Sequence, residues 1–126
     1  MIKFIINMEL QKIIIKYQNK NLNIPIIVEG INDIKSLKKI HFPGKIININ
    51  RGKSLYNFSE YISNNYNNVI LLTDFDKKGI FLKNKIKVYL NSMDINVDLK
   101  LWDYIKNNCN INDVESMPAL LDNNTI

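Results

Sequence analysis

The stretch VILLTDFDKKG, residues 69–79, decides the fold that this sequence predicts. Its first four residues are apolar, which is typical of a strand buried in a parallel sheet. The strand is expected to end at Thr73, and Asp74 and Asp76 follow with one residue between them. Ligands of open α/β sheets bind at the carboxyl ends of strands, where this pattern places both carboxylates. Like charges this close repel, so the pattern predicts a cation beside them, and Mg²⁺ is the first candidate because it prefers oxygen ligands.

A purely structural interpretation of these residues stays open. Asp76 stands before KKGIFLKNKI, residues 77–86, where an aspartate is a good N-cap for a helix. Asp74 would then lie in the turn between the strand and that helix. The rest of the chain has to decide between the two interpretations.

The composition is that of one ordinary globular domain. The chain has 126 residues, of which 46% are hydrophobic and 23% are charged. No apolar run approaches the roughly 20 residues of a membrane span, and MIKFIINMEL at the start lacks the pattern of a signal peptide. A single cysteine, Cys109, and a single histidine, His41, leave no internal disulfide and no zinc constellation. We therefore expect a cytoplasmic protein without a membrane partner.

The charge balance favours an anionic partner. The formal net charge is +5, and lysine supplies nearly all of the positive charge, since Arg51 is the only arginine. A basic chain suits nucleic acid above all, either RNA or DNA, although lysine-rich faces are often only solvated.

Strand and helix patterns alternate along the chain. Apolar runs predict strands at residues 24–28, 45–50, 69–73 and 95–102. Helical spacing predicts helices at 4–20, from Asn32 or Asp33 to about 40, from Ser54 to about 64, and from Asp76 to about 93.

This alternation predicts a single three-layer, Rossmann-like α/β domain. It would contain a four-stranded, mainly parallel sheet with helices on both faces, plus an N-terminal amphipathic helix. The expected organisation is an N-terminal helix in 1–23 packed on the domain, the domain itself in 24–110, and a C-terminal tail in 111–126.

The loops after parallel strands all lie at one edge of the sheet, so residues distant in the chain meet there. Glu29 ends the first strand as Asp74 ends the third, and Gly30 is expected to allow a tight turn. Gly52 and Gly79 are interpreted as backbone devices, for a turn and for close approach at a helix start. The charged residues expected at this edge are Glu29, Asp33, Arg51, Lys53, Asp74, Asp76 and Lys78.

Two motifs together resemble a known family. IVEGINDIKSL, residues 27–37, and VILLTDFDKKG, residues 69–79, resemble the Toprim domain of topoisomerases, primases and certain ribonucleases. In that pattern one apolar strand ends in Glu-Gly with an aspartate a few residues on, and a later strand ends in Asp-x-Asp near a glycine. The match covers roughly residues 24–102 and looks most like the small stand-alone Toprim proteins of archaea and bacteria.

The resemblance implies roles for the matching residues. Glu29 would act as general acid or base at a phosphodiester and would share a metal with Asp74 and Asp76. The implied cofactor is Mg²⁺, as one or two ions, with Mn²⁺ able to substitute. Lys78, together with Arg51 and Lys53, would hold neighbouring phosphates, and Asp33 would be either a helix cap or an outer metal ligand.

Three functions are compatible with these residues. The leading hypothesis is a Mg²⁺-dependent enzyme of nuclease or nucleotidyl-transfer type. The alternative is a non-catalytic module that binds metal and nucleic acid in a larger complex, with a protein partner supplying substrate specificity. A phosphatase of the haloacid dehalogenase type, with Asp74 as nucleophile, fits less well because it leaves Glu29 and Gly30 unexplained. A complete topoisomerase or primase is not expected, since nothing here matches their further domains.

Overall fold

The computed structural model describes the backbone of residues 2–49 and 52–123, and the side chains of 8–49 and 52–122. Arg51 lies outside the described residues. Within them the sheet has four strands, β1 (Ile26–Val28), β2 (Ile46–Asn48), β3 (Asn68–Leu71) and β4 (Asn96–Asp98). Their order is β2-β1-β3-β4, and every neighbouring pair is parallel.

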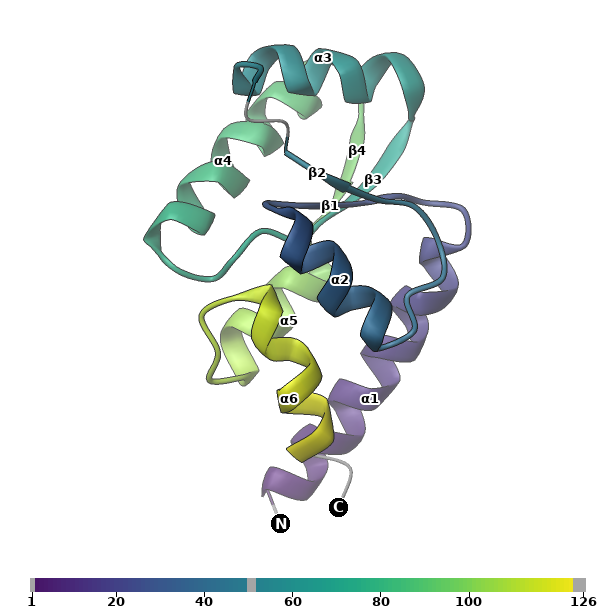
Figure 1. Cartoon of the computed structure of the whole chain (residues 1–126), viewed down its shortest axis with the longest axis vertical. Helices are drawn as coiled ribbons and strands as arrows, with labels where there is room; N and C mark the ends of the chain where they lie inside the picture. Colours follow the sequence, from purple (N-terminus) through teal and green to yellow (C-terminus); the bar gives the residue numbers. More distant parts are fainter. Residues whose placement is uncertain (1, 50–51, 124–126) are drawn as a thin grey trace.

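Helices cover both faces of this sheet (Figure 1). They are α1 (Ile2–Asn21), α2 (Ile31–Lys39), α3 (Leu55–Asn65), α4 (Lys77–Ser92), α5 (Lys100–Asn108), the short 3₁₀ helix η1 (Val114–Ser116) and α6 (Met117–Asn123). Helices α3 and α4 pack on one face, and α1, α2, α5 and α6 lie on the other. The predicted three-layer α/β fold with an N-terminal helix is therefore confirmed.

The central strands β1 and β3 are mainly apolar because both of their faces are buried. In β1, Ile26 and Val28 belong to the core beneath α1 and α2, whereas Ile27 belongs to the core beneath α3 and α4. The same alternation holds in β3, where Ile70 and Leu71 face opposite cores.

The predicted strand at 95–102 is wrong in its second half. Strand β4 ends at Asp98, and Lys100 already begins α5. Leu101, Trp102 and Ile105 are buried there at helical spacing. A short alternation of apolar residues fits both the period of a strand and the period of a helix. The helix forms because Trp102 and Ile105 extend the row of apolar side chains that faces the core.

Two of the three predicted helix caps are confirmed. Ser54 Oγ accepts a hydrogen bond from the Asn57 N–H, and Asp76 accepts one from the Gly79 N–H. Helix α2 differs, because its N-cap is Gly30 rather than Asn32 or Asp33. Asp33 instead reaches back from the first turn and accepts a hydrogen bond from the Gly30 N–H at 3.0 Å.

The expectation that the backbone freedom of Gly30 is needed for a tight turn is wrong. Gly30 is extended, with φ −144° and ψ 173°, a conformation that any residue adopts. A Cβ built there would meet only Asp33 Oδ2, at 3.9 Å. Gly79 does meet the expectation of close approach, because a Cβ there would lie 2.0 Å from the Asp74 carbonyl oxygen.

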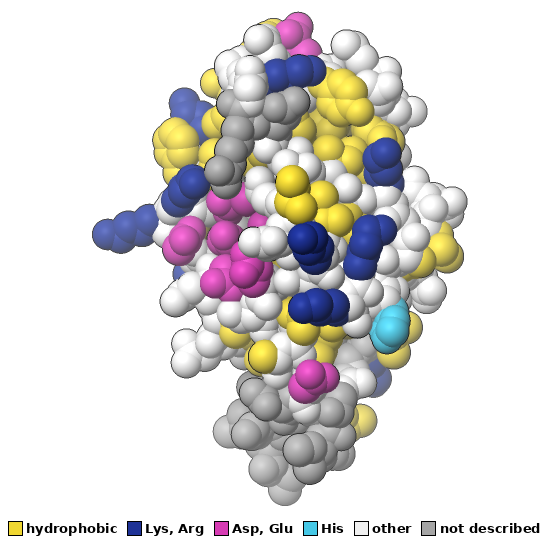
Figure 2. All heavy atoms as spheres, viewed as in Figure 1, with side chains coloured by type: hydrophobic (Ala, Val, Ile, Leu, Met, Phe, Trp, Pro, Cys, Tyr) yellow, Lys and Arg dark blue, Asp and Glu magenta, His cyan; other side chains and the backbone are white. Residues whose placement is uncertain are grey.

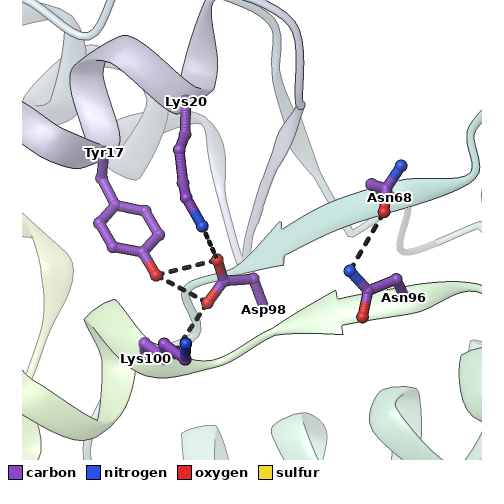
Figure 3. A network of polar contacts seen from close by, with 6 residues as sticks. All are labelled: Tyr17, Lys20, Asn68, Asn96, Asp98 and Lys100. Carbon is purple, nitrogen blue, oxygen red and sulfur yellow. Dashed lines mark hydrogen bonds and ion pairs between the residues drawn. The ribbon is translucent and has the colours of Figure 1, made fainter.

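Helix α1 is attached to the edge strand β4 through a polar network (Figure 3). The buried Tyr17 hydroxyl donates to both carboxylate oxygens of Asp98, at 2.7 and 2.9 Å, and Lys20 Nζ lies 2.9 Å from Asp98 Oδ2. Burial opposes ionisation of Asp98, but the bonds from the Lys100 N–H, Lys20 and Tyr17 outweigh it and hold the pKa of Asp98 below its usual range. Burial, together with Asp98, raises the pKa of Tyr17.

Candidate functional site

The candidate site lies where the topology of the sheet changes direction. Strand β1 has β2 on one side and β3 on the other, so the chain leaves β1 toward one edge and returns past it to β3. In open α/β sheets, the crevice at such a switch point, outside the carboxyl ends of the strands, is the usual place for a ligand. Glu29 directly follows β1, and Asp74 and Asp76 come shortly after β3.

A backbone N–H holds one oxygen of each predicted carboxylate, and one of these bonds joins Glu29 to the Asp74 loop, whereas Asp76 does not line the cleft beside them. Glu29 Oε2 accepts from the Asp74 N–H at 2.7 Å, which joins the ends of the two central strands. Asp74 Oδ1 accepts from the Val114 N–H at 3.0 Å, and Asp76 Oδ1 accepts from the Gly79 N–H at 2.8 Å. The other oxygen of each of these three carboxylates accepts no hydrogen bond from the described part of the chain.

The loop after β3 is held rigidly around Asp74. Trp102 Nε1 donates to the Thr73 carbonyl at 3.0 Å, and Thr73 Oγ1 donates to the Gly79 carbonyl at 2.9 Å. The Phe75 N–H donates to the Asn112 carbonyl at 2.8 Å. A loop fixed from several sides preorganises its carboxylates, as a binding or catalytic site requires.

The C-terminal segment contributes to the site in a way that the sequence did not indicate. The Val114 N–H holds Asp74, and Glu115 lines the same cleft. Val114 is buried in the core beneath α1 and α2, so η1 is anchored beside the strand ends. Trp102, which ends the stretch 95–102 predicted as a strand, instead supports the Asp74 loop from α5.

Asp33 joins the acidic group from the first turn of α2. Its side chain is nearly buried, and burial raises its pKa, opposed by the bond from Gly30 and reinforced by the charges of Glu115, Glu29 and Asp113. Asp33 thus caps the N-terminus of α2 and also lies near the other carboxylates of the site. Figure 2 shows a cluster of acidic side chains on the face in view, with basic side chains near it.

A cleft of about 1000 Å³ opens beside these carboxylates. Lys53 and Lys78, both predicted at this edge of the sheet, line the cleft. Its acidic wall consists of Glu29, Asp33, Asp74 and Glu115. The remaining lining residues are Gly30, Ile31, Asn32, Ile47, Asn48, Gly52, Phe58 and Tyr61.

The carboxylate oxygens of the site meet some, but not all, of the needs of a hard cation. The like charges around Asp74 would be offset by a cation, and carboxylate oxygens are the ligands that Mg²⁺ prefers. In residues 8–49 and 52–122, however, no three Asp, Glu, His or Cys side chains are placed to hold a metal together. Mg²⁺ commonly takes only one or two carboxylates and completes its shell with water and phosphate. The residues therefore fit an ion that is bound by one or two carboxylates and shared with a substrate.

Asp74 has an unusual affinity for protons. Burial raises its pKa to about 7, opposed by the Val114 N–H and reinforced by the charges of Glu29, Asp33 and Asp76. Between the usual aspartate pKa and about 7, the folded protein therefore binds more protons at this side chain than the unfolded chain does. Ionisation of Asp74 thus makes folding less stable as pH rises through this window.

We expect the Asp74→Asn variant to be more stable than wild type at pH 8 in the presence of EDTA, by about 1–2 kcal/mol after solvent screening. The amide keeps an oxygen for the Val114 N–H and removes the charge. At about pH 4, near the usual aspartate pKa, the difference should largely disappear, because Asp74 is then largely protonated in both the folded and the unfolded protein. Urea unfolding at both pH values measures this, and equal pH dependence of the two proteins would contradict it.

The fold and the site define a parallel α/β protein with carboxylates at the switch point of its sheet. The chain is 53% identical over 104 residues to a UPF0292 protein of Thermoplasma volcanium, a match that covers 82% of this chain and 87% of that one. UPF0292 proteins of Methanosarcina barkeri and Methanocaldococcus jannaschii are each 36% identical, over 73% and 74% of this chain and 65% and 74% of theirs. The chain belongs to the UPF0292 family.

A solved structure of a protein from Aquifex aeolicus has the same fold. It superposes with a TM-score of 0.74 at 28% identity, over 85% of this chain and 96% of that one. In the described residues, no helix has the length and apolar character that crossing a membrane requires.

The expected assignment to the Toprim proteins is wrong. The relatives above are named UPF0292 proteins, and no family model matches the chain. Two short motifs at strand ends recur wherever a parallel sheet carries acidic residues at its carboxyl edge, so they are weak evidence of a family. The chemistry of the site is therefore argued below from its own geometry.

Proposed function

We propose that this protein is a cytoplasmic, Mg²⁺-dependent enzyme that acts on the phosphodiester bonds of nucleic acid, as a nuclease or a nucleotidyl-transfer enzyme. The observation that carries the proposal is the meeting of Glu29 with the Asp74 loop at the switch point of the sheet. The adjoining cleft offers lysines to an anionic backbone, and the whole chain carries a net charge of +5.

Each residue has a role that its surroundings support. Asp74 and Asp76 would hold the ion through the oxygens that their backbone hydrogen bonds leave open. When bound, Mg²⁺ would offset negative charge on the phosphate oxygens. Glu29 Oε2 is engaged by the Asp74 N–H, so its Oε1 is the atom that would hold or move a proton. Lys53 and Lys78 would bind neighbouring phosphates.

A non-catalytic module is the second candidate function. It is favoured by the lack of three convergent metal ligands among the described side chains. In that case the protein would bind metal and nucleic acid, and a protein partner would supply the specificity or the missing catalytic group. A phosphatase with Asp74 as nucleophile gains little support, because it gives no role to the contact between Glu29 and the Asp74 loop.

The proposal is tested by incubating the protein with structured and single-stranded RNAs and DNAs, in Mg²⁺ or in EDTA. We expect cleavage or strand transfer only in Mg²⁺, and at least a tenfold loss in the Asp76→Asn variant. Asparagine caps helices as well as aspartate does, so this variant should keep α4 and lose only the charge.

Asp94→Asn is the matched control, because Asp94 is exposed and follows the opposite end of α4. Asp94 has φ of 61°, which asparagine tolerates well. Equal activity of the Asp76→Asn and Asp94→Asn variants would overturn the proposal. Salt-sensitive binding without any turnover would instead support the non-catalytic module.

A further inference from the structure

One part of the cleft lining, the uncharged wall, differs in chemistry from the carboxylates. It contains Ile31 from the first turn of α2, Phe58 and Tyr61 from α3, and Asn48 from the end of β2. This wall has no carboxylate among its described residues. One cleft therefore combines carboxylates with apolar, aromatic and amide side chains.

Two large apolar side chains on this wall are exposed. Ile31 is 63% exposed and Tyr61 is 41% exposed, although both line a concave surface. Such side chains are normally buried or scattered, and their gathering in a pocket is typical of a site that binds a planar or apolar ligand group. They come from helices on opposite faces of the sheet, so the ligand group would lie across its carboxyl edge.

The side-chain nitrogen of Lys53 lies over the aromatic ring of Tyr61. Lys53 Nζ lies 5.1 Å from the centroid of the Tyr61 ring. Sites for single-stranded nucleic acid combine aromatic rings with cations, because a base can stack on the ring while the cation binds the adjacent phosphate. Asn32 and Asn48 line the same cleft, and their amides can donate to and accept from the edge of a base.

We propose that this wall binds an unpaired nucleobase, with Tyr61 as the stacking residue, so that the substrate is single-stranded nucleic acid. The proposal rests on the proposed function and names its substrate class. A base inside a duplex presents no face to Tyr61, whereas a splayed base can enter a cleft of about 1000 Å³. The backbone next to that base then lies between Lys53 and the acidic wall.

The test measures binding of a ten-nucleotide strand that carries 2-aminopurine, whose fluorescence is quenched by stacking. It is made as DNA and as RNA, each with an abasic counterpart, and measured in Mg²⁺ with the Glu29→Gln variant so that the strand stays intact. In that background, Tyr61→Ala is expected to weaken binding of the base-containing strand about 5- to 100-fold and to abolish the quenching. Tyr61→Phe keeps the ring and should bind as the parent does.

Tyr56→Ala is the matched control, because Tyr56 is an exposed tyrosine of the same helix that packs on Tyr89 and does not line the cleft. The abasic strand should bind equally to the parent and to Tyr61→Ala. If Tyr61→Ala binds base-containing and abasic strands as the parent does, the nucleobase site is overturned. That result would not decide the proposed function, which is tested separately by the cleavage assay with the Asp76→Asn variant.

Discussion

The Glu29→Gln variant is expected to fold as the wild type does and to lose Mg²⁺-dependent turnover by about 10²- to 10⁴-fold, the usual contribution of a general acid or base. Glutamine keeps an oxygen that can accept from the Asp74 N–H, so the link between the ends of β1 and β3 survives. What disappears is the negative charge and the ability to carry a proton. Single-turnover cleavage of the best substrate measures the loss.

Glu60→Gln is the matched control for this change, because Glu60 is exposed on α3 and does not line the cleft. Removing the charge of Glu29 also removes one of the charges that raise the pKa of Asp74. We therefore expect Glu29→Gln to be at least as stable as wild type in urea. Turnover equal to that of Glu60→Gln would show that Glu29 has no part in the chemistry.

The Gly79→Ala variant is expected to lose about 3 kcal/mol of stability or more. The added Cβ would lie 2.0 Å from the Asp74 carbonyl oxygen and 2.4 Å from its carbonyl carbon. These are backbone atoms that cannot rotate away, and Trp102 holds the carbonyl of the preceding residue. The start of α4 and the Asp74 loop must therefore separate, which also displaces the carboxylates.

Thermal and urea unfolding measure this loss, which corresponds to a fall in Tm of roughly 10 °C for a domain of this size. Gly30→Ala is the matched control, because its backbone is extended and its Cβ would meet nothing closer than 3.9 Å. That variant should be neutral or slightly stabilised, since alanine restricts the unfolded chain. Equal stability of the two variants would contradict the close contact at Gly79.

Local features of the fold were predictable because they depend on neighbours in the chain. The strand predicted at 69–73 matches β3, Asn68–Leu71, to within one residue at its start and two at its end, and Ser54 and Asp76 were recognised as caps from their positions. The strand prediction failed at 95–102, where the apolar residues fit the period of a strand and that of a helix. The prediction of a helix cap failed at Gly30, because a glycine has no side chain that marks it as an N-cap. In both places tertiary packing outweighed the local pattern.

The sequence by itself determined the order of strands and helices, the parallel sheet, and the placing of Glu29, Asp74 and Asp76 at strand ends. The tertiary structure alone decided that β1 lies between β2 and β3, and so that Glu29 meets Asp74. It also brought in the Val114 N–H, 40 residues from Asp74, and Trp102, 29 residues from Thr73. Contacts over such separations form only when whole elements pack, so no spacing in the sequence encodes them.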